Sequence, residues 1–186
     1  MKSGIERAYP IIGTRVFVLA RNRGDVMRNT SGFSLIELLI VVAIILIIAA
    51  LAAPSFLHAR MAANESAAVG ELRTLNTAQI SYNSTYPTVG FANVLSYLAG
   101  TTCAGTAPTS SSACLIDSAM GSGTRSGYVF TLSGVSGTPA STYQVVATPI
   151  GVNQTGVNFF CTFADAVVRS SAATITTCDG TISPQR

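Results

Sequence analysis

The chain has 186 residues, of which 48% are hydrophobic and 10% are charged. It is therefore apolar and charge-poor for a soluble protein, in which about a quarter of residues are charged. The net charge of +3 comes from residues 1–32, with six Lys or Arg and two acids; residues 33–186 hold five Arg and six acids, close to −1. Because the chain after residue 32 has no excess of positive charge, we expect no nucleic acid as a partner.

Residues 1–32 form a basic segment ahead of a long apolar run. Their own apolar patch, residues 16–20, is too short to cross a membrane. Positive charge beside a membrane span keeps that side in the cytoplasm. Met27 begins a shorter basic stretch that ends at Gly32, so there are two alternatives for residues 1–26: translation starts at Met27, or the leader is naturally long. In both cases residues 1–32 take no part in the expected fold.

Residues 33–53 are predicted to form a membrane-spanning helix. Fourteen of these 21 residues are Leu, Ile, Val or Phe, and Glu37 is the only strongly polar one. A helix of this length spans roughly 30 Å, the thickness of a hydrocarbon core. The apolar residues favour insertion by about 4–8 kcal/mol, more than the roughly 2.5–3.5 kcal/mol that one acid costs at the centre of a span. An acid inside such a segment is a functional-site candidate, and it needs a partner.

Glu37 gains a partner if the chain is cut after Gly32, a small residue at the polar-to-apolar border. Cleavage would give Phe33 a positive α-amine about one helical turn before Glu37. The amine could pair with Glu37 of its own helix, or with Glu37 of a neighbouring helix that is staggered by about a turn. Either pairing offsets the desolvation of both charges, and the second also sets the register of a helix bundle. A secretory signal fits less well, because its cleavage site follows a shorter apolar core.

The sequence from Gly32 to Leu38, GFSLIEL, resembles the class III signal of type IV pilins and of type II secretion pseudopilins. The resemblance extends to about Tyr82. It implies that a prepilin peptidase cuts between Gly32 and Phe33 and N-methylates Phe33, and that Glu37 guides assembly. It further implies a homo-oligomeric filament built through the N-terminal helices, with an inner-membrane assembly platform and its ATPase as partners.

Residues 54–84 are predicted to continue the helix as an amphipathic half. Pro54 stands where the family commonly has a helix-bending proline. We expect it to bend the helix, because it removes a backbone donor and its ring clashes with the preceding turn. One stripe recurs at spacings of three, four or seven and should face a packed partner: Leu57, Met61, Ala68, Leu72, Leu75 and Tyr82. The opposite side carries Arg60, Asn64, Glu65, Glu71 and Arg73.

Residues 85–186 are predicted to form a globular head. A weak apolar face predicts a short helix at 91–98. Residues 127–132, 142–147 and 158–163 are β-branched and aromatic and are separated by turn residues, so we expect three strands, with a fourth short edge strand at 167–169. The fold class expected is α+β: a long N-terminal helix packed against a small antiparallel β-meander.

The four cysteines, Cys103, Cys114, Cys161 and Cys178, allow three pairings. The local pairing, Cys103 with Cys114 and Cys161 with Cys178, is the simplest. Each bond would stabilise the head by about 3 kcal/mol if the head lies outside the cytoplasm. A zinc site is the alternative, although no CxxC pair is present. The stretch to Cys178 resembles the disulfide-bounded C-terminal region of type IV pilins.

No catalytic motif occurs in the sequence. It has no HExxH, no phosphate loop and no GxSxG, and it contains one His and few acids. We therefore expect no enzymatic activity, no cofactor and no metal. Asp117, Asp165 and Asp179 are candidates for a calcium site of the kind found in major pseudopilins, but scattered loop acids are expected to be solvated instead.

The function expected is that of a type IV pilus subunit, held in the bacterial inner membrane as a prepilin and then assembled into a cell-surface filament, with its head outside the cytoplasm. Two alternatives stand: a pseudopilin of type II secretion, and a minor tip pilin with a binding role.

Overall fold

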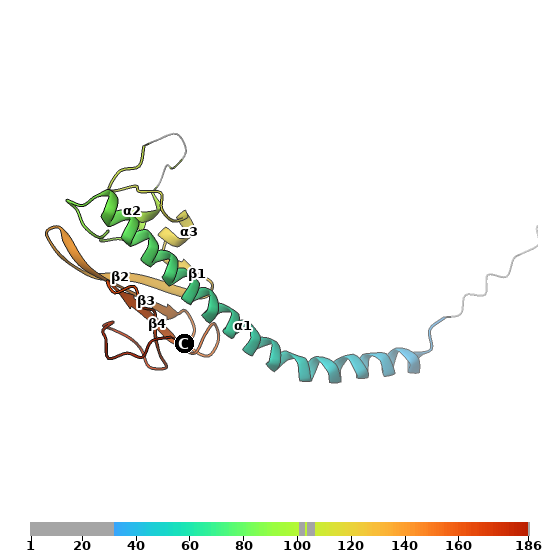
Figure 1. Cartoon of the computed structure of the whole chain (residues 1–186). Helices are drawn as coiled ribbons and strands as arrows, with labels where there is room; N and C mark the ends of the chain where they lie inside the picture. The colour runs from blue at the N-terminus through green and yellow to red at the C-terminus, as the bar shows by residue number, and fades with distance from the viewer. Residues whose placement is uncertain (1–31, 101–102, 104–106, 186) are drawn as a thin grey trace, which may run out of the picture. The chain divides into compact units, whose positions relative to one another are not determined.

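The computed structural model of the chain describes residues 32–100, 103 and 107–185. The predicted leader up to residue 31, with Met27, lies outside these residues. The first element is α1, Leu35–Thr85, a single helix of 51 residues that continues through Pro54 (Figure 1). The expected bend at Pro54 stays a prediction. By length and composition, α1 is able to cross a membrane.

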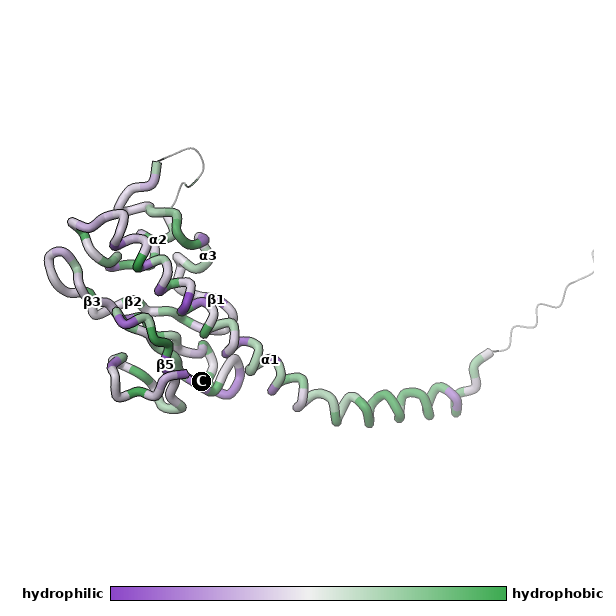
Figure 2. Tube along the Cα trace, viewed as in Figure 1, coloured by the Kyte–Doolittle hydropathy of each residue, from purple (hydrophilic) through white to green (hydrophobic). Residues whose placement is uncertain are grey.

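The two halves of α1 differ in composition, as the hydropathy colouring in Figure 2 shows. Residues 35–53 contain neither Gly nor Pro and are almost continuously apolar. The second half mixes apolar and polar residues, and α1 ends at Thr85, one residue beyond the predicted end at 84. Pro87 explains this end, because a proline disfavours the helical conformation of the residue before it.

Five antiparallel strands follow as a meander in the order β1-β2-β3-β4-β5. Their bounds are Thr124–Arg125, Tyr128–Gly137, Ala140–Pro149, Phe159–Phe163 and Arg169–Ser171. The predicted meander is confirmed, with corrected details. β2 and β3 continue past their predicted ends to a tight hairpin at Thr138-Pro139. This Gly/Ser-rich stretch has no apolar pattern that predicts a strand, and it is extended because the two strands pair with each other there.

Three smaller differences concern short elements. β1 was not predicted, since its two residues are defined only by pairing with β2. β5 begins at Arg169, where the edge strand was expected to end. Helix α2 is Leu95–Ala99, shorter than the predicted 91–98, because the Phe91 amide donates to Ala140 O (3.0 Å) at the β2–β3 hairpin. Helix α3, Ser118–Gly121, was also missed; Asp117 caps it by accepting from the Met120 amide at 2.7 Å.

The core lies between the second half of α1 and the sheet. Leu72, Leu75 and Tyr82 are completely buried and belong to one apolar cluster with Tyr128 and Phe160 of the sheet. The predicted α+β class, a long helix packed on an antiparallel sheet, is therefore confirmed. One member of the predicted stripe is wrong: Leu57 is 56% exposed. The burial of the stripe begins at Met61, one turn further along.

Candidate functional site

Gly32, Phe33 and Ser34 precede the first turn of α1. Gly32 is exposed, and a Cβ built on it would meet no atom within 4 Å. The packing of the described fold therefore does not require glycine at this position, so a requirement from outside the fold, such as recognition by an enzyme, would explain it better.

Glu37 lies in the first turn of α1 and is exposed. A negative charge there is favoured by the free amide groups at a helix N-terminus, by about 0.3–1 kcal/mol in water. Among residues 32–185 with their two short gaps, no hydrogen bond or ion pair to the Glu37 carboxylate occurs. The partner that an acid in an apolar segment needs is therefore not found among the described residues.

The apolar residues around Glu37 are exposed on every side of the helix. Phe33 is 81% exposed, and each Leu, Ile and Val from Leu35 to Leu51 is at least 46% exposed. A helix that is apolar all round is stable only when lipid or other helices surround it. This first half of α1 therefore requires an apolar environment that the rest of the described fold does not supply.

The loop between β3 and β4 is attached to α1 by polar side chains that were expected on the side opposite the apolar stripe. Asn64 donates to Thr155 O at 2.9 Å. Glu65 accepts from the amides of Val157 (2.7 Å) and Asn158 (3.0 Å), and from the Asn158 side chain (2.9 Å). Burial by itself would raise the pKa of Glu65, but these three hydrogen bonds outweigh it and lower the pKa below its ordinary value.

Glu71 was also expected on the side of α1 opposite the apolar stripe, but its carboxylate pairs with Arg125 at 2.9 Å. Arg125 also pairs with Asp117, the cap of α3. The side of α1 that was expected to be free is thus used to hold the start of the sheet and α3.

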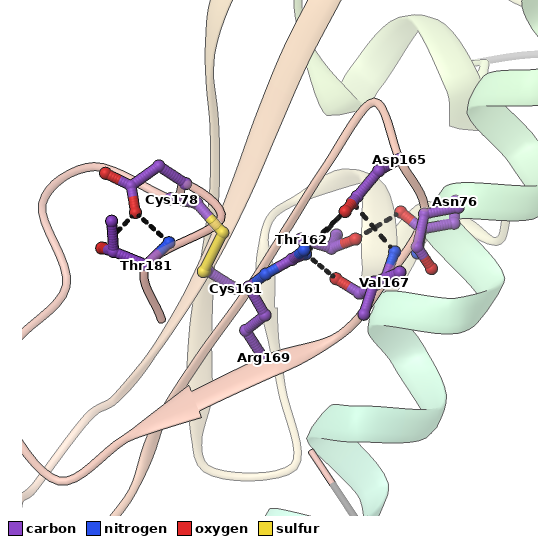
Figure 3. Close-up of polar contacts among 10 residues, drawn as sticks. Asn76, Cys161, Thr162, Asp165, Val167, Arg169, Cys178 and Thr181 are labelled. Carbon is purple, nitrogen blue, oxygen red and sulfur yellow. Dashed lines mark hydrogen bonds and ion pairs between the residues drawn. A yellow bond between two sulfur atoms is a disulfide. The ribbon is translucent and has the colours of Figure 1, made fainter. Parts of the chain in front are cut away.

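Two buried polar residues of α1 were missed. Asn76 accepts from the hydroxyls of Tyr143 (3.0 Å) and Thr162 (3.1 Å) and donates to Ala166 O at 3.0 Å, partly visible in Figure 3. Gln79 exchanges two bonds with the Ala92 backbone, at 3.1 and 2.9 Å. Each follows a residue of the buried stripe, Leu72 or Leu75, by four positions. This spacing was the signal in the sequence that could have predicted their burial. Burial, followed by the nearby Asp165 charge, raises the pKa of Tyr143 to about 12.

The structure contains two disulfides, Cys103–Cys114 and Cys161–Cys178. The first closes the connection between α2 and α3, and the second ties β4 to the C-terminal segment (Figure 3). Since Cys161 is completely buried and Cys178 nearly so, the second bond also belongs to a small apolar cluster on the sheet.

The three candidate calcium acids are placed in separate local structures. Asp117 caps α3, Asp165 pairs with Arg169 at 2.6 Å (Figure 3), and Asp179 accepts from the Thr181 amide at 2.9 Å. The Met120 amide contributes most to lowering the pKa of Asp117. Within the described residues, no group of three His, Cys, Asp or Glu is arranged to hold a metal ion.

Comparison with known proteins concerns a limited part of the chain. Residues 27–53 match the family model of the prokaryotic N-terminal methylation motif. A stretch of 40 residues is 60% identical to a protein of Thermus thermophilus named "Type IV wide pilus major component PilA4". That stretch is 22% of this chain and 30% of the relative, so the match spans about a third of the relative's length. No solved structure matches. The two matches confirm the family resemblance that was drawn from residues 32–38.

Proposed function

We propose that this chain, whose residues 27–53 match the prokaryotic N-terminal methylation motif, is a structural subunit of a type IV pilus. The observation that carries the proposal is one combination at the N-terminus. The motif coincides with a helix that is apolar and exposed on all sides and has a single acid, Glu37, in its first turn. Such a segment suits assembly rather than catalysis, so the proposed role is structural.

The proposed maturation begins at the border between Gly32 and Phe33. A prepilin peptidase cuts this bond on the cytoplasmic side and methylates the new amine of Phe33. The subunit stays in the inner membrane with residues 33–53 in lipid and the head outside the cytoplasm. The exposure of Gly32, and the open space around a side chain at this position, support this as a processing site.

Assembly then exchanges one apolar environment for another. A helix that is apolar all round leaves the bilayer only if neighbouring helices cover the same surface. Glu37 is expected to pair with the Phe33 amine of a neighbouring subunit, because a charge left unpaired in an apolar bundle costs several kcal/mol. The pair would fix the stagger between subunits, which is the best-attested use of a buried polar group in an apolar seam.

Substitution of Glu37 tests this role. We expect Glu37→Ala to be processed normally and to yield fewer filaments, measured as the processed protein in the membrane and in the sheared surface fraction. Glu71→Ala is a matched control, since it removes an acid from the same helix at its contact with Arg125. Wild-type filament yield from Glu37→Ala would overturn the role of Glu37 in assembly.

A pseudopilin of type II secretion and a minor tip pilin are the alternative functions. Two disulfides in the head and the similarity to a named pilus component favour the pilus. The charge of residues 33–186, near −1, argues against a tip subunit that binds DNA. The assembly platform and its ATPase are proposed partners on the same grounds.

Intact mass of the protein in sheared and membrane fractions separates these functions. A sheared species that starts at methylated Phe33 and has both disulfides would establish a surface pilin. A processed species confined to the membrane would favour a pseudopilin or a scarce minor subunit. A chain that retains its leader in every fraction would contradict processing at Gly32, and the filament role with it.

A further inference from the structure

The loop between β3 and β4 exposes apolar side chains close to the proposed membrane span. Ile150 is 59% exposed, Val152 50% and Val157 40%. On α1, Phe56 and Leu57 are also exposed, at 69% and 56%. Water is a poor environment for such a group of side chains, and exposed apolar patches commonly mark an interaction surface.

These two sets of side chains belong to one end of the head. The loop is attached to α1 at Asn64 and Glu65 by the four hydrogen bonds described above. Its tip, Asn153 to Thr155, lines a hollow together with Leu57, Arg60 and Met61 of α1. The tip therefore reaches along the helix to the first turns that follow Pro54.

Helix geometry gives the depth of this end. Leu57 follows Ala53, the last residue of the predicted span, by four residues, which is about 6 Å along the axis. The headgroup layer on each side of a hydrocarbon core is about 5–8 Å thick. The tip of the loop thus lies at the level of the lipid headgroups when residues 33–53 occupy the hydrocarbon core, and a tilted helix would bring it closer.

The charges at this end also suit a phospholipid surface. The Glu65 carboxylate is occupied by amides of the loop. Arg60 is exposed and makes no ion pair with any described residue, so its guanidinium is free to reach phosphate groups while its stem lies on apolar surface.

The loop has a defined conformation before it meets a partner. The amides of Gln154 and Thr155 donate to Gly151 O at 3.0 and 2.8 Å, and the Asn153 amide donates to Gly156 O at 2.9 Å. Little conformational entropy would be lost on docking, because the exposed apolar residues sit on or beside this closed turn.

We propose that the β3–β4 loop, with Phe56, Leu57 and Arg60 of α1, is a membrane-docking surface that seats the head on the phospholipid headgroups of the bilayer before assembly. The inference rests on the proposed membrane span. It adds a second contact with the bilayer, one that must be released when the subunit leaves for a filament.

Single-tryptophan variants test this surface, since the chain contains no tryptophan. Val152→Trp reports on the loop and Phe56→Trp on the end of the span. Val89→Trp is the control. Val89 is 43% exposed and follows the C-terminal end of α1, and that end lies about 42 Å from Leu57 along the helix. The full chain is reconstituted in vesicles of phosphatidylethanolamine and phosphatidylglycerol in which part of the lipid is brominated near the headgroup.

We expect bromolipid to quench Val152→Trp and Phe56→Trp to a similar degree, and to leave Val89→Trp unquenched. Val157→Trp repeats the loop measurement if Val152→Trp does not fold. Quenching at Phe56→Trp without quenching in the loop would overturn the inference alone. A chain that does not float with the vesicles and is unquenched at every position would overturn the proposed span. Shielding of the loop only in sheared filaments would identify a second subunit as the occupant and contradict a lipid surface.

Discussion

The two halves of α1 belong to one helix but bury their side chains in different ways. In the first half, Leu46 and Ile47 are 63% and 64% exposed, and their apolar neighbours on every side of the helix are exposed as well. In the second half, Leu72 and Leu75 are completely buried by the head. All-round apolarity lets the first half exchange lipid for neighbouring helices, whereas a single stripe gives the second half one permanent partner.

The buried polar residues sharpen this difference. Asn76 and Gln79 occupy the packed stripe and have hydrogen-bond partners in the head. A polar group in an apolar interface specifies one geometry, because only one arrangement satisfies it. In the first half, Glu37 is the corresponding residue, and its partner is proposed to come from another subunit. The second half is thus packed within the described fold, while the first half would be completed by the proposed assembly.

The largest expected effect comes from making the same substitution in both halves. Leu72→Ala should lower the free energy of unfolding of the head by about 2–5 kcal/mol, since it leaves a cavity between α1 and the sheet. Leu46→Ala should leave head stability unchanged, as Leu46 has no packed partner in the described fold. Urea unfolding in detergent checks both variants. Equal losses at the two positions would contradict the division of α1 into a packed and an unpacked half.

A smaller effect is expected from the polar contacts of the packed half. Asn76→Ala should lower the free energy of unfolding by about 1–3 kcal/mol, because Tyr143 and Thr162 lose a buried acceptor. Thr77→Ala is the control, for Thr77 is exposed and bonds only to Arg73 O within α1. Thermal unfolding measures both. A stable Asn76→Ala head would show that the amide is dispensable.

The smallest effect concerns the contact between Glu65 and the β3–β4 loop. Since the pKa of Glu65 is lowered by folding, its contribution is present above the ordinary value of 4.5 and is lost as the pH falls through the lower folded pKa. Glu65→Gln should remove this part of the acid dependence, about 0.5–1 kcal/mol.

Unfolding midpoints followed from neutral to acid pH test this prediction. Asp117, Asp165 and Asp179 also have lowered pKa values and should preserve the remaining acid dependence in Glu65→Gln. An identical pH profile for wild type and variant would remove the assigned role of the Glu65 carboxylate.

Much of the molecule follows from local sequence. The apolar run, the lone Glu37 and the motif around Gly32 are short-range features, and they predicted the exposed half of α1 and the match of residues 27–53 to the N-terminal methylation motif. Short β-branched and aromatic runs between turn residues predicted the three main strands, and helical spacing predicted Leu72, Leu75 and Tyr82 as core. These inferences succeeded because each depends on residues within a few turns or one strand of one another.

Tertiary structure alone decided how the polar residues of α1 are used. Glu65 meets Val157 across 92 positions of the chain, and Asn76 meets Ala166 across 90. In the sequence, Glu65 resembles an ordinary solvent-facing helix residue, and Asn76 differs from one only by its spacing of four from Leu72. Their hydrogen bonds arise only when the sheet packs on α1 and brings loop amides and hydroxyls to them, and no local pattern encodes that distant pairing. By itself, the sequence determined which half of the helix needs an apolar environment; the packing of the head determined which polar side chains of the other half are buried.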